Sequence, residues 1–113
     1  MVSLHLNAFK GYNKDAHGCE VLIQKGDLSS GILASVLLEK FSNVISTNRG
    51  VKQRTKRKRG GLILCATNAT IRVLAEPLFI DGTEGLMMLD ADFTDNIAML
   101  YAEGILEYIE RMC

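Results

Sequence analysis

Short, continuous runs of apolar residues alternate along the chain with polar segments that contain glycine and asparagine. Four of these runs have the length and apolar content of a buried strand: residues 2–6, 19–23, 62–66 and 71–80. Pro77 cannot donate to a sheet ladder, so the last run is expected to leave the sheet near that residue. Strands that are apolar throughout favour a sheet that helices cover on at least one face.

Two longer segments carry apolar residues at spacings of three and four, which is typical of an amphipathic helix. The first is expected to begin near Ser29 or Ser30, either of which can cap a helix, and to end before Asn48-Arg-Gly50. The second is expected over residues 92–111, with acidic residues at its start and Arg111 at its end, as the helix dipole favours.

The predicted order of elements is therefore strand, strand, helix, strand, strand, helix. This order indicates an α/β fold: an open, mostly parallel sheet of about four strands covered by two main helices. One hundred and thirteen residues suit a single domain, residues 1–113, which is long enough to bury its own core. No apolar run approaches the roughly 20 residues that cross a bilayer, so no membrane partner is expected.

The three cysteines, Cys19, Cys65 and Cys113, are odd in number and far apart in the sequence. Their spacing suits neither a disulfide framework nor a metal site, and a free cysteine in an apolar run behaves as a small hydrophobe. This favours a reducing compartment. The first residues have neither a basic nor a long apolar region, which predicts no signal peptide and a cytoplasmic location as synthesised. Action on a cell wall would then need separate release.

The formal net charge of zero conceals a strong segregation of charge. The window of residues 49–59 holds no acidic residue and seven basic ones, namely Arg49, Lys52, Arg54, Lys56, Arg57, Lys58 and Arg59. Such a block is either a solvated loop or an anion-binding loop, because the Arg guanidinium matches phosphate and carboxylate geometry. It has no aromatic residue on which a base could stack, so nucleic acid is not expected as a partner.

Two of the strand candidates each deliver one chemically useful side chain. Ser3-Leu-His-Leu-Asn-Ala8 delivers His5, and Ala75-Glu-Pro-Leu-Phe-Ile-Asp81 delivers Glu76. A lone histidine in an apolar strand is either a hydrogen-bonded core residue or a metal ligand, and one imidazole alone binds zinc weakly. Glu76 is either a satisfied carboxylate, paired for example with Arg72, or a catalytic base.

Taken in order, these segments resemble the zinc-dependent N-acetylmuramoyl-L-alanine amidases, which cleave peptidoglycan. The resemblance runs along nearly the whole chain and is to the C-terminal part of that family's catalytic domain. Four further segments contribute to it: Ala16-His-Gly-Cys-Glu-Val-Leu22, Arg49-Gly-Val-Lys52, Arg59-Gly-Gly-Leu62 and the closing helix Ile97-Ala-Met-Leu-Tyr-Ala-Glu-Gly-Ile-Leu-Glu-Tyr-Ile109.

The resemblance implies that His5 is a zinc ligand and that Glu76 is the catalytic base. In such a site zinc polarises the amide carbonyl and acidifies a bound water, while the Glu carries the proton to the leaving amine. A catalytic zinc needs three protein ligands and an open position. The family's other two ligands, a His in a Gly-His-Gly-Gly-type loop and a Glu, have no counterpart here, and His17 matches a non-ligand position.

Two functions of different classes follow, and whether the chain is an enzyme stays open between them. The first is part of a phage or bacterial peptidoglycan amidase, inactive as the isolated chain. The second is a non-catalytic module whose basic loop, residues 49–59, binds or sequesters an anionic ligand such as a nucleotide. The lack of the family's N-terminal strand also predicts an exposed sheet edge and a homo-oligomer, most simply a dimer, through residues 2–6 or 19–23.

Overall fold

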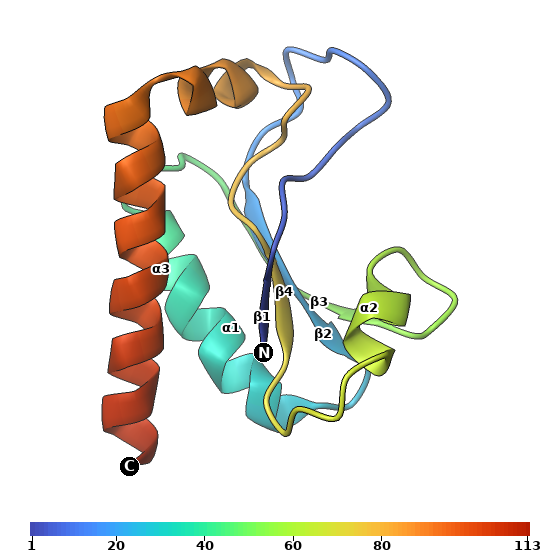
Figure 1. The fold of residues 1–113 in the computed structure, drawn as a ribbon. Coiled ribbons are helices and arrows are strands. Elements are labelled where there is room, and N and C mark those ends of the chain that lie inside the picture. Colours follow the sequence, from blue (N-terminus) through green and yellow to red (C-terminus); the bar gives the residue numbers. More distant parts are fainter.

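A computed structural model describes the whole chain, residues 1–113. Four strands form one sheet, two long helices lie on one of its faces, and a short helix lies on the other (Figure 1). The elements in chain order are β1 (Val2–Leu4), β2 (Cys19–Gln24), α1 (Leu28–Phe41), β3 (Asn48–Arg54), α2 (Gly61–Cys65), β4 (Val73–Glu76), the 3-10 helix η1 (Thr83–Leu89) and α3 (Ala91–Met112). The predicted α/β class is confirmed.

The strands lie across the sheet in the order β1-β4-β2-β3. β1 runs parallel to β4 and β2 runs parallel to β3, whereas the two central strands, β2 and β4, are antiparallel. The sheet is thus open and mostly parallel, as predicted. Its edges are β1 and β3.

The main core lies between the sheet and the two long helices. Val21 of β2 and Ala75 of β4 point to this face and are fully buried there. Phe41 of α1 meets Tyr101 of α3 edge-on, with the ring centroids 5.0 Å apart. Because side chains of a strand alternate between faces, the neighbours of the core residues point to the other side of the sheet.

The opposite face is only partly covered. Leu22 and Leu74 pack there against Leu64 of α2 and form a small second apolar cluster. The same face carries the carboxylates of Glu20, two residues before Leu22, and of Glu76, two residues after Leu74. The acidic side chains therefore lie beside α2, on the face that the long helices leave free.

Residues 62–66, which the sequence predicts as a strand, belong instead to α2 and its C-terminal end. A short apolar run fits a buried helical turn as well as a strand, and here the turn buries Leu64. Two glycines at its start, Gly60 as the cap and Gly61 as the first helical residue, allow this turn. Gly60 has a φ of 80°, in the left-handed region, and a Cβ on Gly61 would lie 1.7 Å from the carbonyl oxygen of Thr55.

The basic segment is not a loop along its whole length, as the sequence predicts, because its first half is strand β3. Val51 packs against the main core, and β3 pairs with β2 along its length. The start of α1 also differs: its cap is Asp27, whose side chain accepts hydrogen bonds from the backbone N and the hydroxyl of Ser30 at 3.1 and 2.6 Å. α3 covers the predicted residues.

All three cysteines are free, with Cys19 buried and Cys113 exposed. Burial raises the pKa of the Cys19 thiol, which keeps it protonated and unreactive at neutral pH. None of the helices combines the length and the apolar composition that crossing a bilayer requires.

The order of the strands reduces the candidate strands for the predicted oligomer interface from two to one. β2 lies between β4 and β3, so residues 19–23 offer no free edge, and that part of the prediction is wrong. β1 pairs with β4 on one side only, and Leu4 is 66% exposed. The homo-oligomer itself stays a prediction, now assigned to the β1 edge.

We expect the 113-residue chain to dimerise through β1 at micromolar concentration, and we expect Leu4→Lys to shift it towards the monomer. A charge on an edge strand opposes pairing with a second chain. Sedimentation velocity measures the change. Leu62→Lys is the matched control, because Leu62 is 60% exposed on α2. A monodisperse 12.5 kDa monomer of the unaltered chain would contradict the prediction.

Candidate functional site

One row of side chains crosses the face of the sheet that the long helices leave free. The register of β1 and β4 pairs Leu4 with Ala75, and the backbone N of His5 donates to the carbonyl of Ala75 at 3.0 Å. His5 therefore follows beside Glu76. Glu76 in turn lies opposite Glu20 of β2 in the antiparallel pair. Residues paired in this way point to the same face, so the three side chains form one row.

His5 and Glu76 line one cavity of about 200 Å³ between the strands and α2. The His5 ring is half-buried, and its Nε2 lies 2.9 Å from the hydroxyl oxygen of Ser3. Arg59 and Ile63 border the same cavity. The structure thus brings together the two residues that the sequence singles out for chemistry.

Glu76 is only 4% exposed, and its charge partner is Arg59. The Nη2 atom of Arg59 lies 3.1 Å from Oε2 of Glu76. Burial raises the pKa of the Glu76 carboxyl, the nearby guanidinium of Arg59 opposes that rise, and the charge of Glu20 adds to it. Arg72, the partner considered from the sequence, instead lies 3.8 Å from Asp27.

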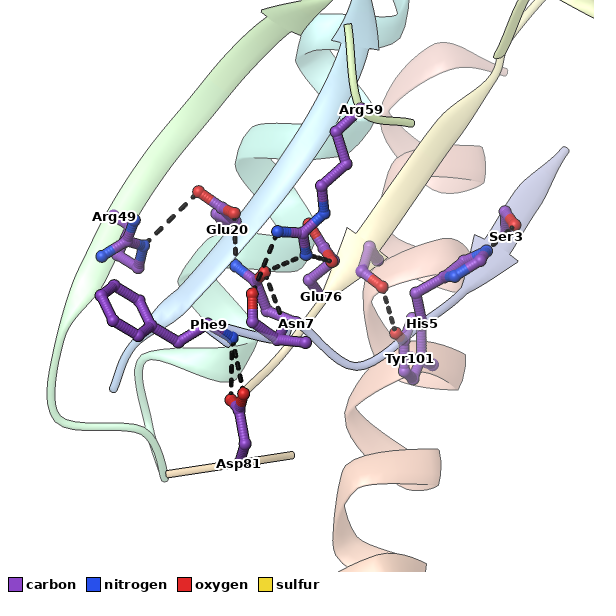
Figure 2. A network of polar contacts seen from close by, with 12 residues as sticks. Ser3, His5, Asn7, Phe9, Glu20, Arg49, Arg59, Glu76, Asp81 and Tyr101 are labelled. Carbon is purple, nitrogen blue, oxygen red and sulfur yellow. Dashed lines mark hydrogen bonds and ion pairs between the residues drawn. The ribbon is translucent and has the colours of Figure 1, made fainter. Parts of the chain in front are cut away.

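Asn7 joins the two buried carboxylates into one network (Figure 2). Its side-chain N donates to Glu20 Oε1 at 2.5 Å, and its side-chain O accepts from the Nη2 of Arg59 that also contacts Glu76. On the other side of Glu20, the Nε of Arg49 is 3.5 Å from Oε2. Each acid thus has one cation, and the amide bridges the two pairs.

Sequence reasoning missed Asn7 and Glu20, which are 2% and 5% exposed. The signal was present: both are polar residues in otherwise apolar strand-like segments, the same feature that drew attention to Glu76. Buried polar groups of this kind require partners, so they tend to occur together. The sequence alone does not show which segments pair.

The loop of residues 8–18 is held beside the network by two carboxylates. Asp81 accepts hydrogen bonds from the backbone N of Phe9 at 2.8 and 2.9 Å and from that of Gly11 at 3.0 Å. These bonds, that of Phe9 first, lower the pKa of Asp81. Glu84 accepts from the backbone N of Gly18 at 2.8 Å. Both ends of the loop are therefore anchored to the segment that follows β4.

A larger cavity of about 510 Å³ adjoins the network on the side of β3. We call it the β3 groove. Asn7, the 8–18 loop with the carboxylate of Asp15, Glu20 of β2 and the ring of Phe79 form its polar and aromatic walls. Its basic wall is formed by Arg49, Lys52, Arg54 and Arg59. The predicted anion-binding set is therefore divided. Lys56, Arg57 and Lys58 are exposed on the turn that follows β3 and do not line the groove.

The metal prediction rests on His5 alone. No three His, Cys, Asp or Glu side chains lie close enough together to hold a metal ion. The acid nearest to His5 in the cavity, Glu76, is engaged by Arg59. His17 is exposed, and its Nδ1 lies 2.7 Å from the backbone carbonyl of Asp15. Since a catalytic zinc needs three protein ligands, residues 1–113 do not by themselves fit one.

The sequence model of one protein family, the N-acetylmuramoyl-L-alanine amidases, matches residues 1–107. The chain belongs to this family. The resemblance stated from the sequence is therefore confirmed. No curated protein sequence matches the chain.

Solved structures of amidases share its fold. The catalytic domain of the CD27L endolysin, which targets Clostridia difficile, is 31% identical with a TM-score of 0.73, and the match covers 94% of this chain and 53% of that one. The CwlD amidase from Clostridioides difficile, solved with the GerS lipoprotein, is 28% identical with a TM-score of 0.79 and coverages of 96% and 53%. An amidase from Clostridium difficile 630 is 24% identical with a TM-score of 0.80 and coverages of 96% and 56%. The chain thus spans just over half the length of these relatives.

We expect Glu76→Gln to make the unfolding free energy less dependent on pH. The raised pKa of Glu76 means that the folded state holds this proton more tightly than the unfolded state. The stability from this group is therefore present below its ordinary pKa of 4.5 and is lost as the pH rises through the raised value. Relative to the variant, the unaltered chain should lose at most about 1.4 kcal/mol per pH unit between pH 4.5 and that raised value, and nothing further above it.

Urea unfolding between about pH 4 and pH 7 measures this difference. The control is Glu103→Gln, which removes an exposed carboxylate from α3. Stability curves of the Glu76 variant and the unaltered chain that stay parallel over this range would contradict the expectation.

Proposed function

We propose that this chain supplies His5 and Glu76 to the site of a peptidoglycan amidase, and that hydrolysis needs further metal ligands from outside residues 1–113. One observation carries the proposal: His5 and Glu76, far apart in the sequence, line the same cavity on the face that the long helices leave free. Family membership supports the reaction class, N-acetylmuramoyl-L-alanine amide hydrolysis.

Glu76 has the properties of a general base. Burial brings its pKa closer to neutrality, where proton transfer in both directions is efficient. The guanidinium of Arg59 favours the ionised form that accepts a proton. In the proposed reaction Glu76 takes a proton from the water that attacks the amide carbonyl and gives it to the leaving amine of L-alanine.

His5 is the one candidate metal ligand of the chain, and zinc is the metal that the family resemblance favours. A half-buried imidazole directly after an edge strand can turn a ring nitrogen towards an ion held partly by other polypeptide. The other ligands would come from outside residues 1–113. The source we propose is a phage or a bacterium, in keeping with relatives that include an endolysin and bacterial amidases.

A non-catalytic anion-binding module is the second candidate. The observation that favours it is the β3 groove, in which Lys52 and Arg54 have no acidic partner. Such a module would bind an anion whether or not a metal is present. Metal analysis combined with a peptidoglycan assay separates the two candidates.

The purified 113-residue chain should release little or no stem peptide from peptidoglycan, with or without added zinc. The reason is that it offers one metal ligand where three are needed. Release of free amino groups from purified cell walls measures the reaction. Robust zinc-dependent release that Glu76→Ala abolishes would contradict this expectation and would show that the chain completes its own site.

The proposal itself is tested by a chimera. The part of the CD27L catalytic domain that this chain does not match is fused ahead of residues 1–113. We expect zinc-dependent release of peptide that His5→Ala and Glu76→Ala each reduce by about a hundredfold or more, as removal of a metal ligand or a base does. His17→Ala is the control, since His17 is exposed. A chimera that folds and binds zinc but releases no peptide would overturn the proposal.

A further inference from the structure

One long stretch of the chain is free of acidic residues. Residues 49–75 contain eight basic residues and no Asp or Glu, and they include the turn after β3, the helix α2 and the loop that leads to β4. Five of the eight cations either line the β3 groove or pair with an acid outside the stretch. The other three are consecutive, and neither the fold nor the site employs them: Lys56, Arg57 and Lys58, which we call the basic turn.

The basic turn presents its charges to solvent. All three side chains are exposed and take part in no ion pair. Two backbone hydrogen bonds close the turn: the N of Lys58 donates to the carbonyl of Thr55 at 3.0 Å, and the N of Gly61 donates to the carbonyl of Lys58 at 2.9 Å. The backbone therefore holds three cations close together at one place on the surface.

An exposed apolar side chain adjoins these cations. Leu62 follows Gly61 in α2 and is 60% exposed. Successive residues of a helix are about 100° apart, so Leu62 points roughly away from Leu64, which is fully buried against the sheet. Leu62 therefore projects from the outer side of α2. Cations beside an exposed leucine match the headgroup region of an anionic bilayer, where phosphates lie next to acyl chains.

The basic turn and α2 lie on the side of the molecule away from its most acidic helix (Figure 1). That helix, α3, carries five acidic residues and one basic residue. The sheet lies between the two helices, so two packed layers of about 10 Å each separate them. This separation exceeds the screening length of about 8 Å at physiological ionic strength. A flat anionic surface would therefore bind the molecule with the basic turn towards it and α3 away from it.

We propose that the basic turn and Leu62 together bind the surface of a bilayer that contains anionic phospholipids. Lying on a bilayer, unlike crossing it, needs no long apolar segment. Nucleic acid is the less favoured polyanion, because residues 49–75 contain no aromatic side chain on which a base could stack. Three cations and one leucine give a weak, reversible attachment, which would concentrate the chain beside a membrane.

The test is co-sedimentation of the 113-residue chain with lipid vesicles. Vesicles of equal parts phosphatidylglycerol and phosphatidylcholine supply the anionic surface, and vesicles of phosphatidylcholine alone supply the neutral one. We expect binding to the anionic vesicles to be at least about tenfold tighter than binding to the neutral ones. We also expect added salt to weaken it, because salt screens exposed charges.

Two variants separate the charges from the apolar contact. Replacing all three residues of the basic turn by Ala should weaken binding to anionic vesicles by about a hundredfold, since each cation near such a surface contributes about fivefold. Leu62→Ser should weaken it by about tenfold, because the leucine no longer leaves water on binding. All four side chains are exposed, so the unfolding midpoints should stay close to that of the unaltered chain.

The matched control removes the same number of charges elsewhere, by Lys10→Ala, Lys14→Ala and Arg111→Ala. These residues are exposed on the 8–18 loop and at the end of α3. The control variant should change the dissociation constant by less than about threefold at physiological salt, where screening limits the effect of distant charges.

Equal binding to the two kinds of vesicle would overturn the proposal, and so would equal weakening by the two triple variants. Unchanged binding of Leu62→Ser would overturn it too, because the leucine would then lie outside the contact. Polyphosphate or single-stranded DNA that binds more tightly than the vesicles, and is lost with the basic turn, would identify a soluble polyanion as the partner instead. The measurement needs neither metal nor hydrolysis, so its outcome is independent of whether the chimera releases peptide.

Discussion

Two carboxylates, Glu20 and Glu76, face each other across the central antiparallel pair of strands, and both are buried. Two unpaired negative charges at this separation would be strongly unfavourable in a site of low dielectric constant. Three nearby residues neutralise or hydrogen-bond the two carboxylates. Arg49 comes from the bulged start of β3, Arg59 comes from the turn before α2, and Asn7 bridges the acids from the segment after β1. The network therefore connects five segments that lie far apart in the sequence.

The same constraint explains why the basic segment has its composition. Four of its seven cations line the groove, and two of these neutralise the buried acids. The glycines at 60 and 61 let the chain turn tightly enough to bring Arg59 over Glu76 before α2 begins. The sequence of residues 49–59 suggests a solvated loop, but two of its cations neutralise buried carboxylates. Its remaining cations, on the exposed turn, do fit the simpler description.

Much of the fold could be predicted from the sequence, because apolar runs and helical spacings report burial directly. The strands at residues 2–6 and 19–23 and the long C-terminal helix followed from those patterns. The segment at 62–66 did not, because five apolar residues satisfy a strand and a helical turn equally well. The choice between them was made by Leu22 and Leu74, which offer Leu64 a surface to pack on. Nothing within the segment itself carries that information.

For the site, the sequence identified His5 and Glu76 by residue type and by family resemblance, and the structure brings both to one cavity. The partner of Glu76 could not be predicted, since the nearby Arg72 and the distant Arg59 are equally suitable chemically. Only the topology decides, because it turns Arg72 towards Asp27 and the start of α1. Which basic residues line the groove likewise depends on the alternation of side chains along β3. A segment predicted as a loop has no such alternation, so the sequence did not show it.

The backbone segments that carry His5 and Glu76 differ in how many neighbouring strands hold them in place. Glu76 ends an interior strand that is paired on both sides, whereas His5 follows a three-residue edge strand with a single neighbour. Local opening of a folded protein begins where backbone hydrogen bonds are few and exposed, so the sheet margin that carries the imidazole should fray well before the carboxylate moves. A polypeptide that added a strand alongside β1 would give β1 a second neighbour and reduce this fraying. The pairing that extends the sheet would therefore also hold the imidazole in place.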